Sequence, residues 1–142
     1  MVSVSDSIVL DRSPAELFAI VADPQSQLIW DAESLKQVEA LTPGPLGKGS
    51  RYRGAFSGLG VVEYEYAEYE PPTRFAHRSI VRMGEIYHTF EFEPLPEGTR
   101  LTHTSTLRAR GLWRLLAPMM RRVMQNRLRA MSIAIRDYLA AQ

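Results

Sequence analysis

Three histidines are the side chains of this sequence best suited to chemistry. His77, His88 and His103 are the only histidines in the chain. An imidazole that is neutral near physiological pH can accept or donate a proton, and three of them can hold a zinc ion. They can also line a wet pocket or make structural hydrogen bonds. We name all three as candidate catalytic residues but favour pocket lining or hydrogen bonding.

The alternation of side chains along three strands predicts that these histidines face the interior. In a strand, every second side chain points to the same face. His77 shares its face with Phe75, and His88 shares its face with Ile86, Phe90 and Phe92. His103 alternates with Leu101 and Leu107. Because the apolar neighbours must be buried, we expect three inward histidines on three consecutive strands.

Further candidate ligand contacts come from tyrosines, methionines and one arginine. Tyr64 and Tyr66 can offer phenol hydroxyls, and the flexible thioethers of Met120 and Met124 suit an adaptable pocket. Arg127 follows Met124 by three residues, so it either faces inward to meet an anionic group or extends its guanidinium to the rim. The complete predicted ligand-binding set is Tyr64, Tyr66, His77, His88, Phe90, His103, Met120, Met124 and Arg127.

We expect no metal and no cofactor. The chain has no cysteine that could ligate a metal or act as a nucleophile. Metal-bound histidines are usually backed by carboxylates, and alternation places the acidic residues of these strands on the outer face. The phosphate-binding, dinucleotide-binding and Gly-x-Ser-x-Gly nucleophile motifs are also absent.

The elements that position these residues can be read from periodicity and turn chemistry. Residues 2–10 alternate as a strand with a break at Asp6. Ser13-Pro14-Ala15-Glu16 predicts a capped short helix that Asp23-Pro24 ends, and a second short helix follows. Six antiparallel strands are expected at 35–41, 49–56, 61–70, 74–81, 86–93 and 99–107. Three- and four-residue apolar spacing then predicts one long helix over 112–139, and Pro118 either kinks it or makes it begin near Ala117.

This order of elements resembles the helix-grip fold of START-like lipid-transfer domains and of bacterial polyketide cyclase/dehydrase-like (SRPBCC) proteins. The residues that carry the resemblance are Ser13 to Phe18, Asp23-Pro24, Trp30, Leu46 to Gly49, Tyr69 to Phe75, Gly98 to Thr102 and the terminal helix. The resemblance covers the whole chain. It implies an α+β fold in which a curved seven-stranded antiparallel sheet wraps around a long C-terminal helix, with two short helices after strand 1 and a cavity between sheet and helix.

Composition is consistent with one domain over residues 1–142. Hydrophobic residues make up 45% of the chain and charged residues 23%, which excludes a disordered chain or a coiled coil. No apolar run approaches the length of a membrane span. The first residues contain no signal peptide, so we expect a cytoplasmic protein, either monomer or homodimer.

Charge is distributed unevenly along the chain. Residues 108–142 hold eight arginines and a single acidic residue, Asp137, whereas residues 1–107 hold nine basic and fifteen acidic residues. We interpret the basic residues as a solvated helix face, with Arg114, Arg121, Arg122 and Arg129 exposed. We expect no nucleic-acid binding and at most weak electrostatic contact with an anionic membrane, because the apolar face of the helix should be buried against the sheet.

The sequence thus supports three functional hypotheses. The first is binding of a small hydrophobic ligand (a lipid, an isoprenoid or a polyketide-like molecule) between the sheet and the C-terminal helix. The second is a polyketide cyclase or dehydratase in which a cavity histidine moves a proton and Tyr64 or Tyr66 polarises a carbonyl. The third is a lipid-delivery or interaction module that uses the basic helix.

Overall fold

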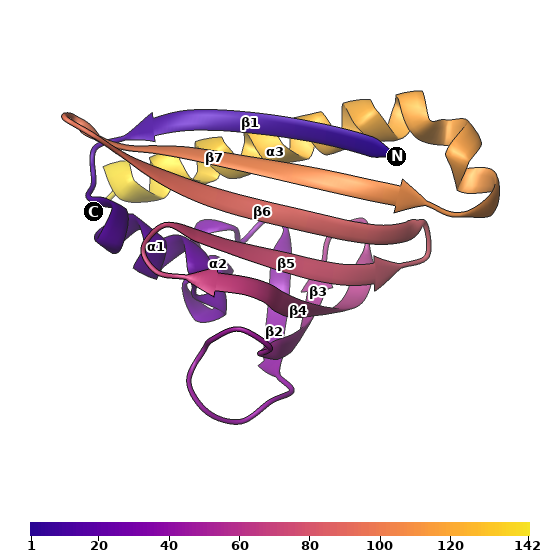
Figure 1. Ribbon diagram of the computed structural model, residues 1–142, viewed down its shortest axis with the longest axis horizontal. Helices are drawn as coiled ribbons and strands as arrows, with labels where there is room; N and C mark the ends of the chain where they lie inside the picture. The colour runs from indigo at the N-terminus through magenta and orange to yellow at the C-terminus, as the bar shows by residue number, and fades with distance from the viewer.

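A computed structural model describes all residues, 1–142, and confirms the α+β helix-grip architecture (Figure 1). Seven strands form one antiparallel sheet in the order β1-β7-β6-β5-β4-β3-β2. The elements are β1 (Val2–Leu10), α1 (Pro14–Ala22), α2 (Pro24–Trp30), β2 (Leu35–Ala40), β3 (Arg51–Phe56), β4 (Gly60–Glu70), β5 (Arg74–Val81), β6 (Gly84–Leu95), β7 (Gly98–Ala109), the 3-10 helix η1 (Gly111–Leu116) and α3 (Ala117–Ala140).

The long helix α3 lies against the inner face of the sheet, beside β1 and β7 (Figure 1). Its C-terminal end reaches α1, and Arg12 donates a hydrogen bond to the carbonyl of Leu139 over 3.2 Å. The main apolar cluster lies between the sheet, α1 and α3, and it includes Phe18, Phe75 and Ile135. Because the sheet curves around a single helix, side chains do not fill all of the space between them. The unfilled space lies toward the N-terminal end of α3.

Helix boundaries follow the chemistry of the chain. Ser13 Oγ accepts a hydrogen bond from the backbone N–H of Glu16 over 3.2 Å, which is the predicted cap of α1. Pro118 lies in the first turn of α3, where its missing N–H costs nothing. Of the two alternatives predicted for Pro118, the structure has the one in which the long helix begins near Ala117. Residues 111–116 form the separate helix η1, and α3 begins at Ala117.

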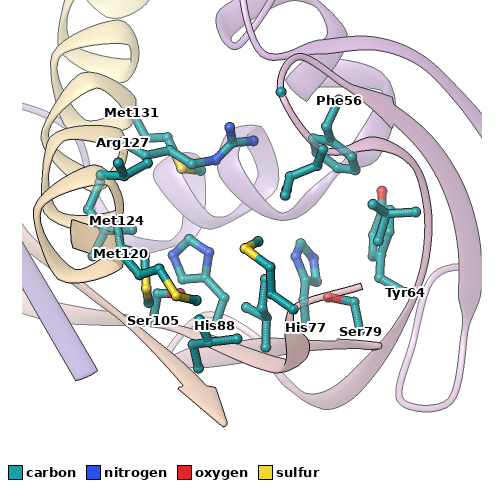
Figure 2. A pocket seen from close by; sticks show the side chains of 18 of the residues that line it. Phe56, Tyr64, His77, Ser79, His88, Ser105, Met120, Met124, Arg127 and Met131 are labelled. Atoms are coloured by element: carbon teal, nitrogen blue, oxygen red, sulfur yellow. The ribbon is translucent and has the colours of Figure 1, made fainter. Parts of the chain in front are cut away.

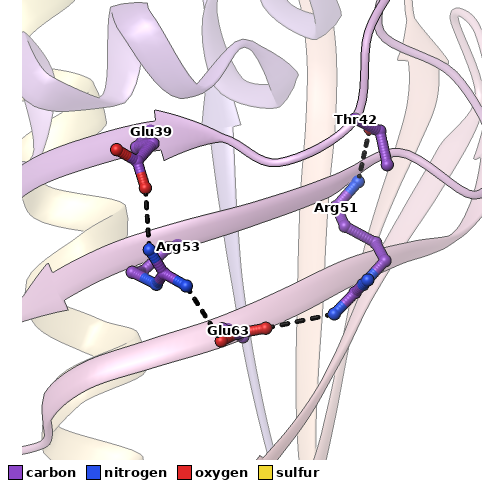
Figure 3. Close-up of polar contacts among 5 residues, drawn as sticks. All are labelled: Glu39, Thr42, Arg51, Arg53 and Glu63. Atoms are coloured by element: carbon purple, nitrogen blue, oxygen red, sulfur yellow. Dashed lines mark hydrogen bonds and ion pairs between the residues drawn. The ribbon is translucent and has the colours of Figure 1, made fainter.

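The outer face of the sheet is polar and carries a network of ion pairs. Arg53 donates to Glu39 over 2.9 Å and to Glu63 over 3.3 Å, and Arg51 donates to Glu63 over 3.1 Å (Figure 3). The backbone N–H of Arg51 also donates to Thr42 Oγ1 over 3.0 Å. These exposed pairs contribute little stability each, about 0–1 kcal/mol, but they identify the opposite face as the interior.

Strand register brings the histidines together. His77 pairs with His88 across β5 and β6, and His103 pairs with Phe90 across β6 and β7. On the other side of β7, His103 pairs with Asp6 of β1. The side chains of His77, His88, His103 and Asp6 all belong to the inner face, so one end of the sheet interior is unusually polar.

Candidate functional site

A cavity of about 410 Å³ lies between the inner face of the sheet and α3. Its wall is mostly apolar, and Figure 2 shows methionines from α3 on one side and Phe56 and Tyr64 on the opposite side. The wall also includes Met83, Ile86 and Leu107 from the sheet and Trp113 and Leu116 from η1. Burying apolar surface in such a space is favourable by roughly 25 cal/mol per Å², so the cavity suits a hydrophobic molecule.

Two buried polar atoms at this cavity have no partner in the protein. They are the hydroxyl of Tyr64 and Nε2 of His77. The two rings contact each other with centroids 4.8 Å apart. A buried polar atom without a hydrogen bond costs about 1–3 kcal/mol, so this pair is stabilised when a bound molecule or water supplies the missing bond.

Arg127 adds a positive charge to the same region. Its guanidinium carbon lies 5.8 Å from the centroid of the Phe56 ring, and that ring lies 6.0 Å from the ring of Tyr64. Arg127 lines the cavity and forms no salt bridge. Burial lowers the pKa of Arg127, while the charge of Asp31 acts in the opposite direction. Of the two predicted orientations, Arg127 therefore takes the inward one.

A chain of hydrogen bonds leads away from the cavity behind His88. His88 Nε2 lies 3.0 Å from His103 Nδ1, and His103 Nε2 lies 3.0 Å from Ser132 Oγ. Ser132 then donates to Asp6 Oδ2 over 2.6 Å. Asp6 also faces Arg129 at 3.5 Å. The chain thus runs from the cavity wall through a fully buried histidine to the edge strand β1.

Burial keeps the three imidazoles neutral at physiological pH. It lowers the pKa of His77 to about 3. It lowers the pKa of His103 to about 4, although Asp6 and the Leu128 backbone act in the opposite direction. The pKa of His88 is also lowered well below its usual value, first by burial and then by the neighbouring His103, His77 and Arg127. Each ring therefore has one N–H donor and one nitrogen acceptor.

Seven of the nine predicted contact residues line the cavity, namely Tyr64, His77, His88, Phe90, Met120, Met124 and Arg127. Tyr66 and His103 do not, which corrects the sequence-based prediction. Tyr66 is fully buried, and its hydroxyl donates to the carbonyl of Ala22 over 2.6 Å. His103 is fully buried behind His88, and its far nitrogen is hydrogen-bonded to Ser132.

The sequence-based analysis missed three polar residues of this region. Asp6, Ser132 and Asp31 all belong to the interior or its edge, and none of them lies on the three strands that carry the histidines. Asp31 is buried and accepts a hydrogen bond from Gln27, which itself lines the cavity. Two features of the sequence could have indicated these residues. Asp6 breaks the alternation of its strand, and Ser132 directly follows Met131 in the apolar repeat of α3.

Exposed residues of the cavity wall come from η1 and the start of α3 and, on the other side, from the turn after β3 at Ser57 and Gly58. Leu116, Met119 and Val123 line the cavity and are also exposed at the surface, and Leu112 and Leu115 beside them are 81% and 77% exposed. The expectation that the whole apolar helix face is buried is therefore wrong at this end. Arg114, Arg121, Arg122 and Arg129 are exposed, as predicted.

No cluster of three or more histidine and acidic side chains is arranged to hold a metal ion. His77 contacts aromatic rings and stays outside the hydrogen-bonded chain of the other two histidines. No helix combines the length and apolar character needed to cross a membrane.

Comparison with known proteins places the chain in a family. The family model described as "Polyketide cyclase / dehydrase and lipid transport" matches residues 1–135. The chain belongs to this family. It is also 30% identical over 110 residues to an uncharacterized protein of Mycobacterium tuberculosis, a match that covers 75% of this chain and 65% of the relative. The chain thus spans about two thirds of the length of that relative.

Solved structures share the family's fold. A START superfamily protein from Mycobacterium smegmatis has a TM-score of 0.81 at 17% identity, with 98% of this chain and 97% of the other covered. A protein from Mesorhizobium loti has a TM-score of 0.77 at 15% identity, with 99% and 98% covered. At these identities the likeness concerns the fold alone, so the function of this family member has to be argued from its own cavity.

Proposed function

We propose that the protein binds a small hydrophobic molecule with one polar end in the cavity between the sheet and α3. The observation that carries the proposal is the unpartnered state of Tyr64 Oη and His77 Nε2 in the wall of an otherwise apolar cavity. Apolar lining supplies the driving force for binding, and a few fixed polar groups supply orientation.

The polar groups also indicate how the molecule is oriented. Arg127 extends from α3 toward Phe56, and Tyr64 lies beside Phe56 on the opposite wall (Figure 2). A ligand oxygen near Phe56 can accept a hydrogen bond from the guanidinium or from the phenol. The apolar body then lies along Met120 and Met124. Lipids, isoprenoids and polyketide-like molecules that carry a carboxylate or carbonyl fit this arrangement.

Ligand binding is tested by gentle native mass spectrometry of the purified protein and by displacement of a fluorescent probe, 8-anilinonaphthalene-1-sulfonate, with decanoic acid. Ser79→Leu fills the cavity from β5 and should abolish displacement. Thr106→Leu is the matched control, because Thr106 lies on the outer face of β7 and its hydroxyl contacts Ser3. A folded Ser79→Leu variant that binds decanoic acid as tightly as the native protein would overturn the proposal.

A second candidate function is docking to an anionic membrane for ligand exchange. It is favoured by the exposed apolar residues Leu112, Leu115 and Met119 at the mouth of the cavity. Five exposed arginines between residues 108 and 122 form no salt bridge: Arg108, Arg110, Arg114, Arg121 and Arg122. Unneutralised positive charge beside apolar side chains complements an anionic bilayer. Co-sedimentation with phosphatidylserine vesicles tests this candidate.

A further inference from the structure

Four side chains connect the cavity with the outside of the protein by hydrogen bonds. The contacts are His88 to His103 at 3.0 Å, His103 to Ser132 at 3.0 Å and Ser132 to Asp6 at 2.6 Å. They come from four different elements: β6, β7, α3 and β1. At the outer end, the Asp6 side chain is 13% exposed and its neighbour Arg129 is 54% exposed. A packed interior rarely holds an uninterrupted polar chain of this length unless every member is paired.

The direction of each hydrogen bond follows from the chemistry of the groups. Ser132 has a single proton and donates it to Asp6, so its oxygen accepts from His103 Nε2–H. Neutral His103 then has an unprotonated Nδ1, which accepts from His88 Nε2–H. Neutral His88 consequently has an unprotonated Nδ1. The hydrogen bond of the His88 ring is made through Nε2, so Nδ1 is left for a molecule in the cavity that His88 lines.

We propose that these four side chains form a proton relay, and that the protein catalyses enolisation of a ketone held in the cavity with His88 Nδ1 as the base. The proposal rests on the proposed binding of a hydrophobic molecule. It adds a reaction to that binding and a carbonyl group to the ligand. His88 is the catalytic residue, and His103, Ser132 and Asp6 are positioning residues that act through it.

The enolisation step needs no reactant other than the ketone and the four side chains. The C–H bond next to the carbonyl breaks, its proton binds His88 Nδ1, and its electron pair forms the enolate. The Nε2 proton of His88 passes to His103 Nδ1, the Nε2 proton of His103 passes to Ser132 Oγ, and the Ser132 proton passes to the Asp6 carboxylate. No charge is left on either buried imidazole, which an apolar site would penalise. Return of a proton along the same chain regenerates the ketone.

The charges that surround the relay suit this step. Arg127, on α3, lies near enough to His88 to affect its pKa and is available to the enolate oxygen. Arg129, also on α3, faces Asp6 at the outer end. His77 is the remaining titratable group that acts on His88. A fixed positive charge at the position where the enolate oxygen develops stabilises the transition state.

The relay is tested with 2-tetralone in D₂O, with mass spectrometry reading the exchange of its carbon-bound hydrogens. The native protein should accelerate exchange, and His88→Gln should reduce the acceleration about 100-fold or more. Asp6→Asn and Ser132→Ala should reduce it about tenfold or more, with probe displacement by 2-tetralone changed less than about twofold. Asp6→Glu should restore part of the loss. Glu63→Gln, on the outer face of β4, is the control.

A second measurement does not depend on activity. Nitrogen-15 NMR of the native protein should show His88 and His103 with protonated Nε2 and unprotonated Nδ1, and Asp6→Asn should perturb both rings. A proton on His88 Nδ1 would overturn the relay. So would exchange at the solvent rate while 2-tetralone displaces the probe. Failure of 2-tetralone and of decanoic acid to displace the probe would contradict the proposed function itself, and the relay with it.

Discussion

The Nε2 atom of His88 lies 3.0 Å from the Nδ1 atom of His103, so a ring in the cavity wall is oriented by a ring that is fully buried. His103 is oriented in turn by Ser132. The histidines are also continuous with the aromatic cluster of the inner face, because Phe90 stacks on His88 with ring centroids 4.3 Å apart and on Phe75 with centroids 4.5 Å apart.

Buried neutral histidines should make stability depend on pH. The folded-state pKa is about 3 for His77 and about 4 for His103, whereas the ordinary value is 6.5. Below pH 6.5 the unfolded chain binds protons that the folded chain does not, so stability is full above pH 6.5 and falls as the pH drops toward 4. We expect a loss of up to about 1.4 kcal/mol per pH unit for each histidine, measured by urea unfolding between pH 7.5 and 5.

His77→Phe separates the histidine contribution from that of the carboxylates. Phenylalanine fits the aromatic surroundings of His77, whose Nε2 has no partner to lose. The variant should therefore retain its stability at pH 7.5 and show a shallower loss on acidification. An identical pH profile for the native protein and His77→Phe would contradict the assignment of a neutral buried imidazole.

Two neighbouring tyrosines on β4 should respond in opposite ways to loss of their hydroxyl. Tyr66→Phe removes a buried hydrogen bond to the Ala22 carbonyl and should cost about 1–3 kcal/mol. Tyr64→Phe removes a buried hydroxyl that has no partner, so stability should be unchanged or higher. Chemical denaturation of both variants checks this. Equal destabilisation by the two substitutions would mean that Tyr64 has a partner in the empty protein.

Arg127 should contribute more to the binding of a carboxylic acid than to the binding of the corresponding alcohol. Arg127→Met keeps much of the side chain's length and removes the charge, so binding of decanoic acid should weaken by about 1.5–3 kcal/mol, which is roughly 10- to 100-fold. Binding of 1-decanol should change much less, because it forms no ion pair. Calorimetric titration of both probes provides the measurement, with Arg122→Met, on the exposed side of α3, as the control. Equal weakening of both probes would assign Arg127 a packing role.

Contact with anionic vesicles should be weak and sensitive to salt. Each arginine near the bilayer contributes about 1 kcal/mol, and physiological salt screens the attraction beyond about 8 Å. Co-sedimentation with phosphatidylserine vesicles should decrease in Arg122→Gln at low salt and in Leu115→Ser at every salt concentration. Tight binding that survives high salt in both variants would indicate insertion of a larger part of the chain, and no binding at low salt would leave these arginines as solvated charge.

The fold could be predicted from the sequence because each element carries a local signal. Alternation assigned the faces of β5, β6 and β7, and the Ser13 cap located α1. The boundary between η1 and α3 has a local cause as well. Apolar spacing continues through Leu112 and Leu115, but Pro118 makes the α-helix begin at Ala117, and the residues before it form η1.

The site could be predicted only in part, because alternation gives the face of a strand and not the depth along it. Tyr64 and Tyr66 share a face, yet one reaches the cavity and the other is covered by α1. His88 and His103 likewise share a face and differ in their exposure to the cavity. The relay to Asp6 depends on the pairing of β1 with β7 and on the rotation of α3 about its own axis. Local sequence patterns indicate neither of these.

Contacts between decanoic acid and the methionine methyl groups test the central claim most directly. With ¹³C-labelled methionine methyls, the binding account predicts nuclear Overhauser contacts from the alkyl chain to Met120 and Met124, and their loss in Ser79→Leu. Contacts that persist unchanged in the cavity-filled variant would show that the molecule binds outside the cavity and would contradict the account.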